Sequence, residues 1–302
     1  MTDFHLNTSR FLIEERFLNE SININRATAV FYNENDFAFF LSLIFPLFLV
    51  KTIYNERKVS KLFNISFLLL LLLIVVINDS KLVLISIIIQ FIVLLFIVKK
   101  SYLFRSISCV VLILGAIYLI QNPSNIANFV FMYTQIQEGF GSAFIRLNLY
   151  LGGFEILADS YFLGVGPKNY SEYIIHSDRF TGGITNPHSW LIEIMSDYGI
   201  FIFGYYLFLY ITTLNRVYKI CTSIYVNQQV KVISLGIFLS MVGFTISSFS
   251  SSGIMYQFGY WLYMAFVLAF VNNNTILLKE ENSSLNQNNK SYYAAKKIIQ
   301  ST

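Results

Sequence analysis

Charged residues are scarce in this sequence: they make up 13% of its 302 residues, whereas hydrophobic residues make up 55%. Soluble domains usually carry about a quarter charged residues. The shortage of charge therefore excludes an ordinary soluble domain and predicts an integral membrane protein. The net charge of +4 is too small to indicate nucleic-acid binding, so no nucleic-acid partner is expected.

Cysteine and histidine are also rare. Cys109 lies within an apolar run and Cys221 lies just past another, so the pair predicts neither a disulfide nor a metal site, and both are interpreted as packing residues. The three histidines, at positions 5, 176 and 188, lack the paired spacing of metal ligands. No Ser-His-Asp order and no Gly-x-Ser-x-Gly motif occurs. The sequence therefore predicts no metal and no cofactor.

What the sequence has in abundance is long apolar runs, and they predict an all-α, polytopic integral membrane protein with about seven transmembrane helices. Each run is close to the ~20 residues that a helix needs to cross about 30 Å of hydrocarbon. None shows the alternation that is typical of a half-buried strand. The runs cover residues 37–54, 62–77, 82–98, 103–120, 190–214, 232–249 and 254–271.

A long connection, residues 121–189, separates the fourth run from the fifth and contains three of the four prolines. Within it, Ser142 to Asp159 has helical length and no proline, so we expect a partly apolar helix along the membrane surface. The chain then divides into five parts: an N-terminal segment 1–36, a four-helix block 37–120, the large loop 121–189, a three-helix block 190–271 and a tail 272–302.

The basic residues predict the orientation. If seven helices alternate across the membrane, fourteen of the 21 lysines and arginines fall on one side and seven on the other. The richer side is normally cytoplasmic, which places residues 1–36 and the large loop outside and the tail inside. Because an uncleaved outward head of 36 residues is uncommon, we expect further helices upstream in the natural protein or its relatives, so that this chain is shortened at its N-terminus.

His188 is a candidate general base. It follows Asn186-Pro187 and precedes an apolar run, so it is predicted to lie at the mouth of a helix. Histidine titrates near neutral pH, and the positive end of a helix disfavours imidazolium. A neutral His188 could then accept a proton from a sugar hydroxyl. The alternative is an interfacial histidine that only caps the helix or faces lipid headgroups.

Arg146 lies near the start of the predicted surface helix, with Tyr150 on the same face. Its guanidinium suits a diphosphate or a carboxylate because it offers a planar fork of donors. The alternative is an arginine that binds ordinary lipid phosphates at the interface. Arg26 and Lys168 carry the same two interpretations.

Glu193 lies one turn into the apolar run after His188, and Asp197 follows on the same face. A carboxylate within hydrocarbon normally faces a cavity or a partner, so Glu193 is a candidate site residue, although pairing with neighbouring helices is an equal alternative. The segment Leu163-Gly-Val-Gly-Pro167 lacks the third glycine and the preceding strand of a phosphate-binding loop, so a tight turn is the better interpretation.

Taken in order, four motifs resemble the O-antigen ligase and polymerase-related family: Arg146, Gly164-Val-Gly-Pro-Lys-Asn-Tyr170, Asn186-Pro-His-Ser-Trp-Leu-Ile-Glu193 and Tyr198-Gly-Ile-Phe. The segment from Asn25 to Ala38 and the pair Ser80-Lys81 also resemble family segments. The chain departs from the family pattern at Ala29 and Glu34, where glycine and proline are usual, and at Lys81 and Ser189, where arginine and asparagine are usual.

The resemblance implies a glycosyltransferase that uses neither nucleotide sugar nor metal. Its donor would be a glycan on a polyprenyl diphosphate at the outer face of the cell membrane. His188 would activate the acceptor hydroxyl, Arg146 and Arg26 would hold the diphosphate, and Glu193 would orient the histidine or the acceptor. The further residues expected to bind substrate are Gly164, Gly166, Lys168, Tyr170 and Asn186.

Three functions follow from this resemblance or compete with it. The leading one is a polymerase that extends lipid-linked repeat units of capsule, exopolysaccharide or O-antigen. A ligase that moves the finished glycan to another glycan or lipid acceptor is the alternative within the family. A transporter or flippase of lipid-linked glycans is the alternative of another class. Membrane lipids, a flippase and a chain-length regulator are the expected partners.

Overall fold

A computed structural model describes residues 26–97, except 32, and residues 133–275, except 225, 252, 254 and 256. These residues form helices and connecting loops, with no strand among them. The helices are α2 (Glu34–Tyr54), α3 (Lys58–Ile77), α4 (Lys81–Ile97), α7 (Gly141–Asp159), α8 (Asn169–Ile175), α9 (Trp190–Thr222) and α10 (Gln228–Ser247). Residues 133–138 and 258–275 are also helical.

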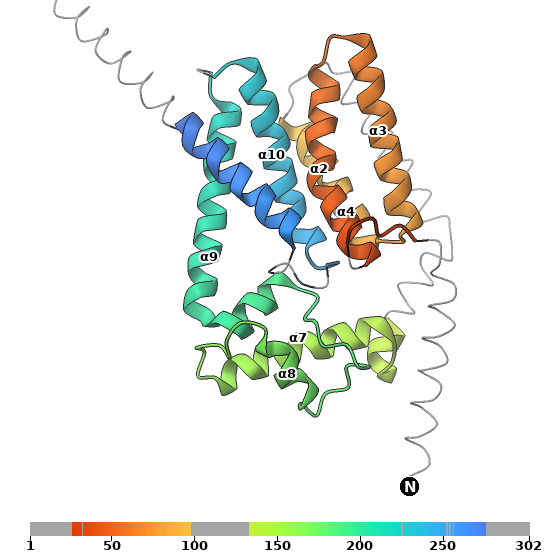
Figure 1. The fold of residues 1–302 in the computed structure, drawn as a ribbon, viewed down its shortest axis with the longest axis vertical. Helices are drawn as coiled ribbons and strands as arrows, with labels where there is room; N and C mark the ends of the chain where they lie inside the picture. The colour runs from red at the N-terminus through yellow and green to blue at the C-terminus, as the bar shows by residue number, and fades with distance from the viewer. Residues whose placement is uncertain are drawn as a thin grey trace, which may run out of the picture.

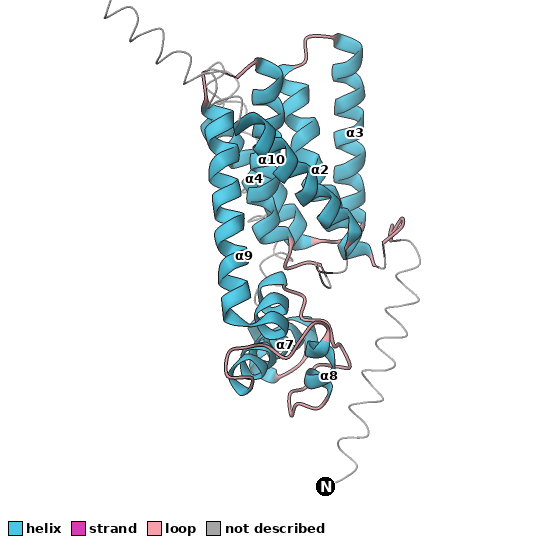
Figure 2. Ribbon diagram, turned by 60° about the vertical axis from the view of Figure 1, so that its left-hand side comes forward, coloured by secondary structure: helices cyan, strands magenta, loops and turns pink. Residues whose placement is uncertain are grey.

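The helices form a bundle with a layer across one end (Figure 1). The bundle contains α2, α3, α4, α9, α10 and the helix of residues 258–275, and α10 lies against α2, α4 and α9. We call α7, α8 and the loops that join them to α9 the cap layer. Figure 2 shows the cap layer below the bundle, reached by the lower end of α9. The cap end of the bundle is the end at which α2, α4 and α9 begin.

Four helices, α2, α3, α9 and α10, are long and apolar enough to cross a membrane, and α4 is a shorter apolar helix. The protein is thus an all-α polytopic membrane protein. The runs predicted at 37–54, 62–77, 82–98, 190–214, 232–249 and 254–271 each overlap a helix of the bundle. The run predicted at 103–120 lies outside the described residues, as do the segments 1–25 and 276–302.

The fifth predicted run was too short. α9 continues past Leu214 to Thr222, so Cys221 lies inside this helix rather than after it. The additional turns are amphipathic: Thr213, Val217 and Ile220 are buried at helical spacing, whereas Arg216 and Lys219 are exposed. Judged by hydropathy alone, the run that begins at Trp190 ends near Leu214, where polar residues become frequent. The helix continues because one of its faces remains buried.

Polar side chains join the helices inside the bundle. Gln90 donates to the backbone carbonyl of Ser42 (3.0 Å), Ser86 to that of Gly243 (2.8 Å) and Ser240 to that of Leu43 (2.7 Å). Small residues let membrane helices approach closely enough for such bonds. At Gly243 a Cβ atom would overlap the Gln90 amide, so this glycine permits the contact between α4 and α10.

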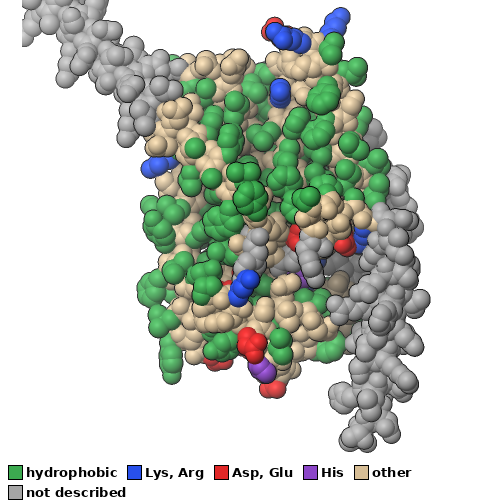
Figure 3. Space-filling model, in the orientation of Figure 1, with side chains coloured by type: hydrophobic (Ala, Val, Ile, Leu, Met, Phe, Trp, Pro, Cys, Tyr) green, Lys and Arg blue, Asp and Glu red, His purple; other side chains and the backbone are tan. Residues whose placement is uncertain are grey.

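Basic residues mark the end of the bundle away from the cap layer, where the space-filling view in Figure 3 shows Lys and Arg side chains above a largely hydrophobic surface. The helix ends and loops there carry Lys51, Arg57, Lys58, Lys61, Arg216, Lys219 and Lys231. This distribution is typical of a cytoplasmic end.

A kink in α9 attaches the cap layer to the bundle. Gly199 leaves helical geometry (φ 81°, ψ 172°), and the segment 162–166 pairs with the freed backbone. The hydrogen bonds run from Val165 N to Ser196 O (2.9 Å), from Gly166 N to Asp197 O (2.8 Å) and from Ile200 N to Phe162 O (3.0 Å). A Cβ atom on Gly164 would overlap the backbone at Asp197 and Gly199. The two backbones therefore meet only because both positions are glycine.

This contact predicts that Gly199→Ala destabilises the protein. Alanine at φ 81° is strained and its Cβ would overlap the carbonyl of Leu163, which we expect to cost about 1–3 kcal/mol. Thermal unfolding of the detergent-solubilised protein measures the loss. Gly204→Ala is the matched control, since it lies in the same helix with nothing within 4 Å of the added methyl. Equal unfolding temperatures for the two variants would contradict the proposed role of the contact.

Candidate functional site

His188 lies where the cap layer meets the bundle, two residues before α9 begins. Ser189 caps that helix by accepting from the backbone N–H of Ile192 (3.5 Å). His188 itself has a φ of 47°, a left-handed conformation that is uncommon for a side chain of this size. Such strain is kept when the surroundings impose it, and it concentrates at functional sites. The backbone thus fixes where this imidazole lies.

Side chains from the cap layer approach His188 on one side. The Tyr150 hydroxyl donates to the His188 carbonyl (3.2 Å), and its ring meets Phe249 edge-on at 6.4 Å. Arg146 lies one helical turn before Tyr150 on α7 and acts electrostatically on both residues. Within the part of the chain that the structure describes, no carboxylate forms an ion pair with Arg146. Among these residues, therefore, no carboxylate neutralises the Arg146 guanidinium at ion-pair distance.

The bundle approaches His188 on the other side, through Asp36 in the first turn of α2 and Ser251 after α10. His188 makes a hydrogen bond with the backbone of Ser251, and its buried Nδ1 has no hydrogen-bond partner among the described residues. A buried ring nitrogen without a partner is unusual and points to a functional site. The imidazole is therefore within electrostatic range of an arginine of the cap layer and of an aspartate of the bundle.

The surroundings keep His188 neutral. Burial lowers its pKa to about 4, and the positive charge of Arg146 acts in the same direction. The charge of Asp36 and the bond to Ser251 oppose these effects without cancelling them. Because the pKa lies well below 7, the ring carries no charge at neutral pH and keeps a lone pair that can accept a proton.

Glu193 lies one turn further along α9 and is 2% exposed. It is close to the loop that meets His188: a Cβ atom on Gly253 would lie 3.3 Å from the nearer carboxylate oxygen of Glu193. Gly253 thus leaves room for this buried carboxylate. The geometry places Glu193 beside the loop that contains Ser251, at the same end of the bundle as His188.

Arg26 lies at the cap end as well, in the segment that leads into α2. It forms an ion pair with Glu34 (3.2 Å), and Asn78 holds this segment by bonding both backbone groups of Ala27. Arg26 is thus part of the same end of the molecule. It already has a carboxylate partner, whereas none is found for Arg146 among the described residues.

The predicted glycine-turn residues have structural contacts of their own. Gly164 and Gly166 pair with the α9 kink, and the Asp197 carboxylate accepts from the backbone N–H groups of Lys168 (3.0 Å) and Tyr170 (2.9 Å) at the start of α8. The Tyr170 side chain is buried and donates to Leu149 O (2.7 Å). The structure therefore gives this stretch the role of a turn that attaches α8 to α9. The Lys168 and Asn186 residues are exposed.

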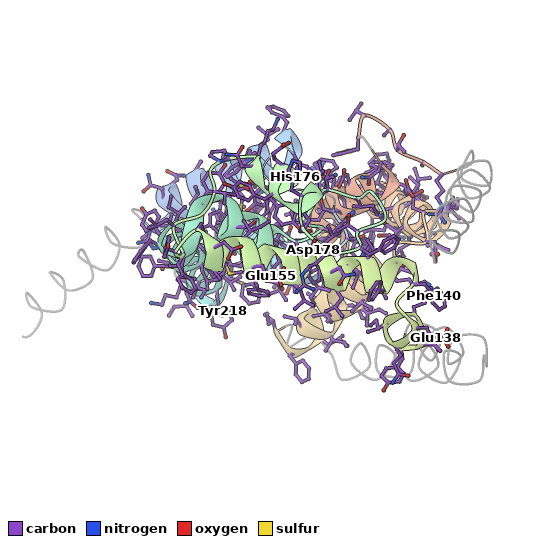
Figure 4. All side chains as sticks on the ribbon, turned by 90° about the horizontal axis from the view of Figure 1, so that it is seen from below. Glu138, Phe140, Glu155, His176, Asp178 and Tyr218 are labelled. Carbon is purple, nitrogen blue, oxygen red and sulfur yellow. The ribbon has the colours of Figure 1, made fainter. Side chains whose placement is uncertain are left out.

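The outer face of the cap layer carries a separate group of charges. Figure 4 looks at this face and shows Glu155 on α7, with Asp178 and His176 in the chain after α8. Arg179 pairs with Glu155 through two guanidinium nitrogens, one at 2.7 Å. Among residues 26–97 and 133–275, no group of three His, Cys, Asp or Glu side chains could hold a metal ion.

Two neighbours of His188, Asp36 and Ser251, are not evident from the sequence. Asp36 is an acidic residue in the first turn of a helix, a position that macrodipole interactions commonly explain. Ser251 stands in a serine-rich run after an apolar segment. The sequence does contain one indication: the Asp36 carboxylate stands at the start of an apolar run, where a charged side chain needs a partner. Only the fold shows that its partner lies 215 residues away.

Comparison with known proteins gives two findings. Residues 65–209 match the family described as O-antigen ligase, a range that includes Arg146, His188 and Glu193. The chain is also 31% identical over 260 residues to a Bacillus subtilis (strain 168) protein named teichuronic acid biosynthesis protein TuaE. That alignment covers 81% of this chain and 52% of the relative, so the chain spans about half of the relative's length.

The electrostatics predict that Arg146→Gln raises the pKa of His188. The substitution removes a positive charge that disfavours imidazolium, so protonation becomes easier and the titration moves toward higher pH. NMR titration of the histidine side chains in the detergent-solubilised protein measures the shift in pKa. The signal that disappears in a His188→Ala variant is that of His188. Arg179→Gln is the matched control, because Arg179 pairs with Glu155 on the outer face. A lower or unchanged pKa in Arg146→Gln would show that this guanidinium does not act on His188.

Proposed function

Because the chain belongs to the O-antigen ligase-related family of membrane proteins, we propose that it is a glycosyltransferase of surface polysaccharide biosynthesis. Its donor is a glycan on a polyprenyl diphosphate, and its site faces away from the cytoplasm. The observation that carries this proposal is a neutral His188, held in a left-handed backbone conformation, together with the charge of Arg146, which has no ion-pair partner among the described residues. Both lie at the cap end of an apolar bundle. A base next to a cation suits the reaction of a hydroxyl with a diphosphate ester.

The proposed reaction moves one proton and one glycosyl group. His188 takes the proton of an acceptor hydroxyl, and the oxygen forms a bond with the anomeric carbon of the donor. The bond between that carbon and the diphosphate oxygen breaks, and its electron pair leaves with the diphosphate. Arg146 binds the departing negative charge, with Arg26 as a second cation at the same end of the bundle. The proton then passes from His188 to water or to the released diphosphate, which restores the neutral base.

Glu193 has a supporting role in this proposal. Its carboxylate is buried beside Gly253 in the loop that also contains Ser251, so it orients the loop or the acceptor rather than receiving the proton. For the residues Gly164, Gly166, Lys168, Tyr170 and Asn186, we propose a contribution to the walls of the substrate site through the α8 turn and the stretch before His188. No metal is required, because positioning and charge neutralisation supply the catalysis.

The proposed orientation follows the basic residues. With the lysines and arginines of the α2–α3 and α9–α10 connections in the cytoplasm, the cap layer lies outside. This arrangement makes residues 121–189 the extracytoplasmic loop and residues 272–302 a cytoplasmic tail, between the blocks 37–120 and 190–271. It puts the site where a flipped lipid-linked glycan would arrive, with its headgroup at the interface and its chain in lipid.

Polymerase and ligase activities use the same chemistry and differ in the acceptor. A polymerase joins a growing chain to another lipid-linked repeat unit, whereas a ligase moves the finished chain to a different glycan or lipid. We propose a polymerase as the leading function and a ligase as the alternative. The name of the Bacillus subtilis relative places that protein in teichuronic acid biosynthesis; this supports a polysaccharide product without distinguishing the two.

A transporter of lipid-linked glycans is supported less well. A transport path needs polar groups that face a passage across the membrane, whereas Gln90, Ser86 and Ser240 bond to the backbones of neighbouring helices. Three acidic residues are buried in the described chain: Asp36 in the first turn of α2, Glu193 in the first turn of α9 and Asp197 just before the kink of α9. All three lie toward the cap end of their helices. This concentration of charge at one end favours an interfacial site.

We predict that His188→Ala abolishes glycan transfer, since loss of a general base typically lowers the rate by about 10²–10⁴-fold. The host strain without its own copy is complemented with each variant, and lipid-linked and transferred glycans are separated on a gel. His176→Ala is the matched control, because His176 is exposed after α8 and its one ion pair among the described residues is with Glu172.

The gel also separates the two functions. A ladder of many repeats that disappears in His188→Ala identifies a polymerase. Long lipid-linked chains in both strains, with transfer to the final acceptor missing only in the variant, identify a ligase. Normal product from His188→Ala that is present in the membrane at the usual level would rule out this residue as the base.

A further inference from the structure

Asp36 is a buried carboxylate with a defined partner. It lies in the first turn of α2, is 6% exposed, and accepts a hydrogen bond from the Ser251 hydroxyl (2.8 Å). Gln257 in turn donates to that hydroxyl (2.6 Å). Burying a carboxylate costs free energy unless the carboxylate is hydrogen-bonded. An acidic residue can stabilise the N-terminus of a helix while it is exposed to solvent. Stabilising α2 therefore does not explain why Asp36 is buried and bonded to Ser251.

Ser251 connects Asp36 to His188. Its hydroxyl bonds to the Asp36 carboxylate, while its backbone bonds to the His188 ring. The three residues come from α2, from the loop after α10 and from the stretch before α9, so the chain brings together segments that are far apart in sequence. The arrangement resembles other sites in which a carboxylate holds and supports a basic imidazole, with a serine interposed here.

The charges around His188 have opposite effects. Arg146 on α7 disfavours the imidazolium form, Asp36 on α2 favours it, and Tyr150 bonds only to the carbonyl of His188. Glu193 on α9 is a further acidic side chain near this loop, beside Gly253. An imidazole that faces only a guanidinium would be a weak base. A nearby anion compensates for the guanidinium while the proton is being transferred.

We propose that Asp36 is a positioning residue for the reaction: it fixes Ser251 against His188 and stabilises the positive charge that His188 acquires when it takes the acceptor proton. This inference rests on the proposed glycosyl transfer for its catalytic meaning. It also goes beyond the residues that match the O-antigen ligase family, since Asp36 and Ser251 both lie outside residues 65–209.

The neighbouring polar contacts provide the matched control. Ser250 bonds to Asn35 (3.2 Å) and to Ser80 (2.9 Å), so it joins the same loop to α2 and to the α3–α4 turn. These bonds resemble that of Ser251 in chemistry and position. They involve neither Asp36 nor His188, so Ser250→Ala tests the general effect of losing a buried hydroxyl bond in this loop.

The test compares Asp36→Asn, Ser251→Ala and Ser250→Ala in the full chain. Asparagine keeps an oxygen that can accept from Ser251 but removes the negative charge. We expect Asp36→Asn to lower the pKa of His188 by about half a unit or more, measured by NMR titration of the detergent-solubilised protein. The chain has only three histidines, so replacing them one at a time assigns each histidine signal. Ser250→Ala should leave the titration of His188 unchanged.

Activity provides the second measurement. We expect Asp36→Asn to slow glycan transfer about tenfold or more and to move the acid limb of the pH–rate profile to lower pH. Ser251→Ala should slow transfer less, and Ser250→Ala should match the unmutated chain. An unchanged His188 titration in Asp36→Asn, or an equal shift in Ser250→Ala, overturns the inference. A third outcome separates the two claims. If Asp36→Asn shifts the titration of His188 but the unmutated chain transfers no glycan, the link between Asp36 and His188 is supported and the proposed function is contradicted.

Discussion

The close backbone contact between residues 162–166 and the kink of α9 is the interaction on which the rest of the site depends. Two facing glycines, Gly164 and Gly199, let the backbones pair where side chains would keep them apart. This pairing holds the cap layer across the end of the bundle. It therefore brings α7, with Arg146 and Tyr150, to the residue that precedes α9. The contact thus helps to hold Arg146 near His188.

The hydrocarbon environment explains why the buried carboxylates collect at this end of the bundle. Within the bundle, polar side chains bond to backbone carbonyls of adjacent helices, as Gln90 does to Ser42, because lipid supplies no alternative partners. At the cap end, buried carboxylates find donors from loops and helix ends. The same boundary suits the proposed donor, whose diphosphate belongs in the interface and whose polyprenyl chain belongs in lipid. In the proposed function, His188 and Arg146 would meet the anomeric carbon of such a substrate at this boundary.

Hydropathy predicted most of the fold because each helix must be apolar over a length set by the bilayer. The predicted surface helix at 142–159 matches α7 (Gly141–Asp159) closely, since no proline interrupts it. The end of α9 was missed because its last turns bury only one face, at Val217 and Ile220. For the site, sequence indicates that Arg146 and His188 belong to one loop, and the structure places them together. Asp36 could not be linked to His188 in this way, because their proximity arises from packing between distant segments and leaves no local pattern.

The most direct test of the account follows the reaction itself in proteoliposomes that contain the purified full chain. Two polyprenyl-diphosphate-linked repeat units serve as donor and acceptor, and the new glycosidic bonds are counted together with the polyprenyl diphosphate released. We expect one diphosphate to be released for each bond formed, and both products to be lost with His188→Ala while the protein remains folded. Bond formation at an equal rate in that variant, or diphosphate release without a new bond, would contradict a glycosyl transfer that depends on His188.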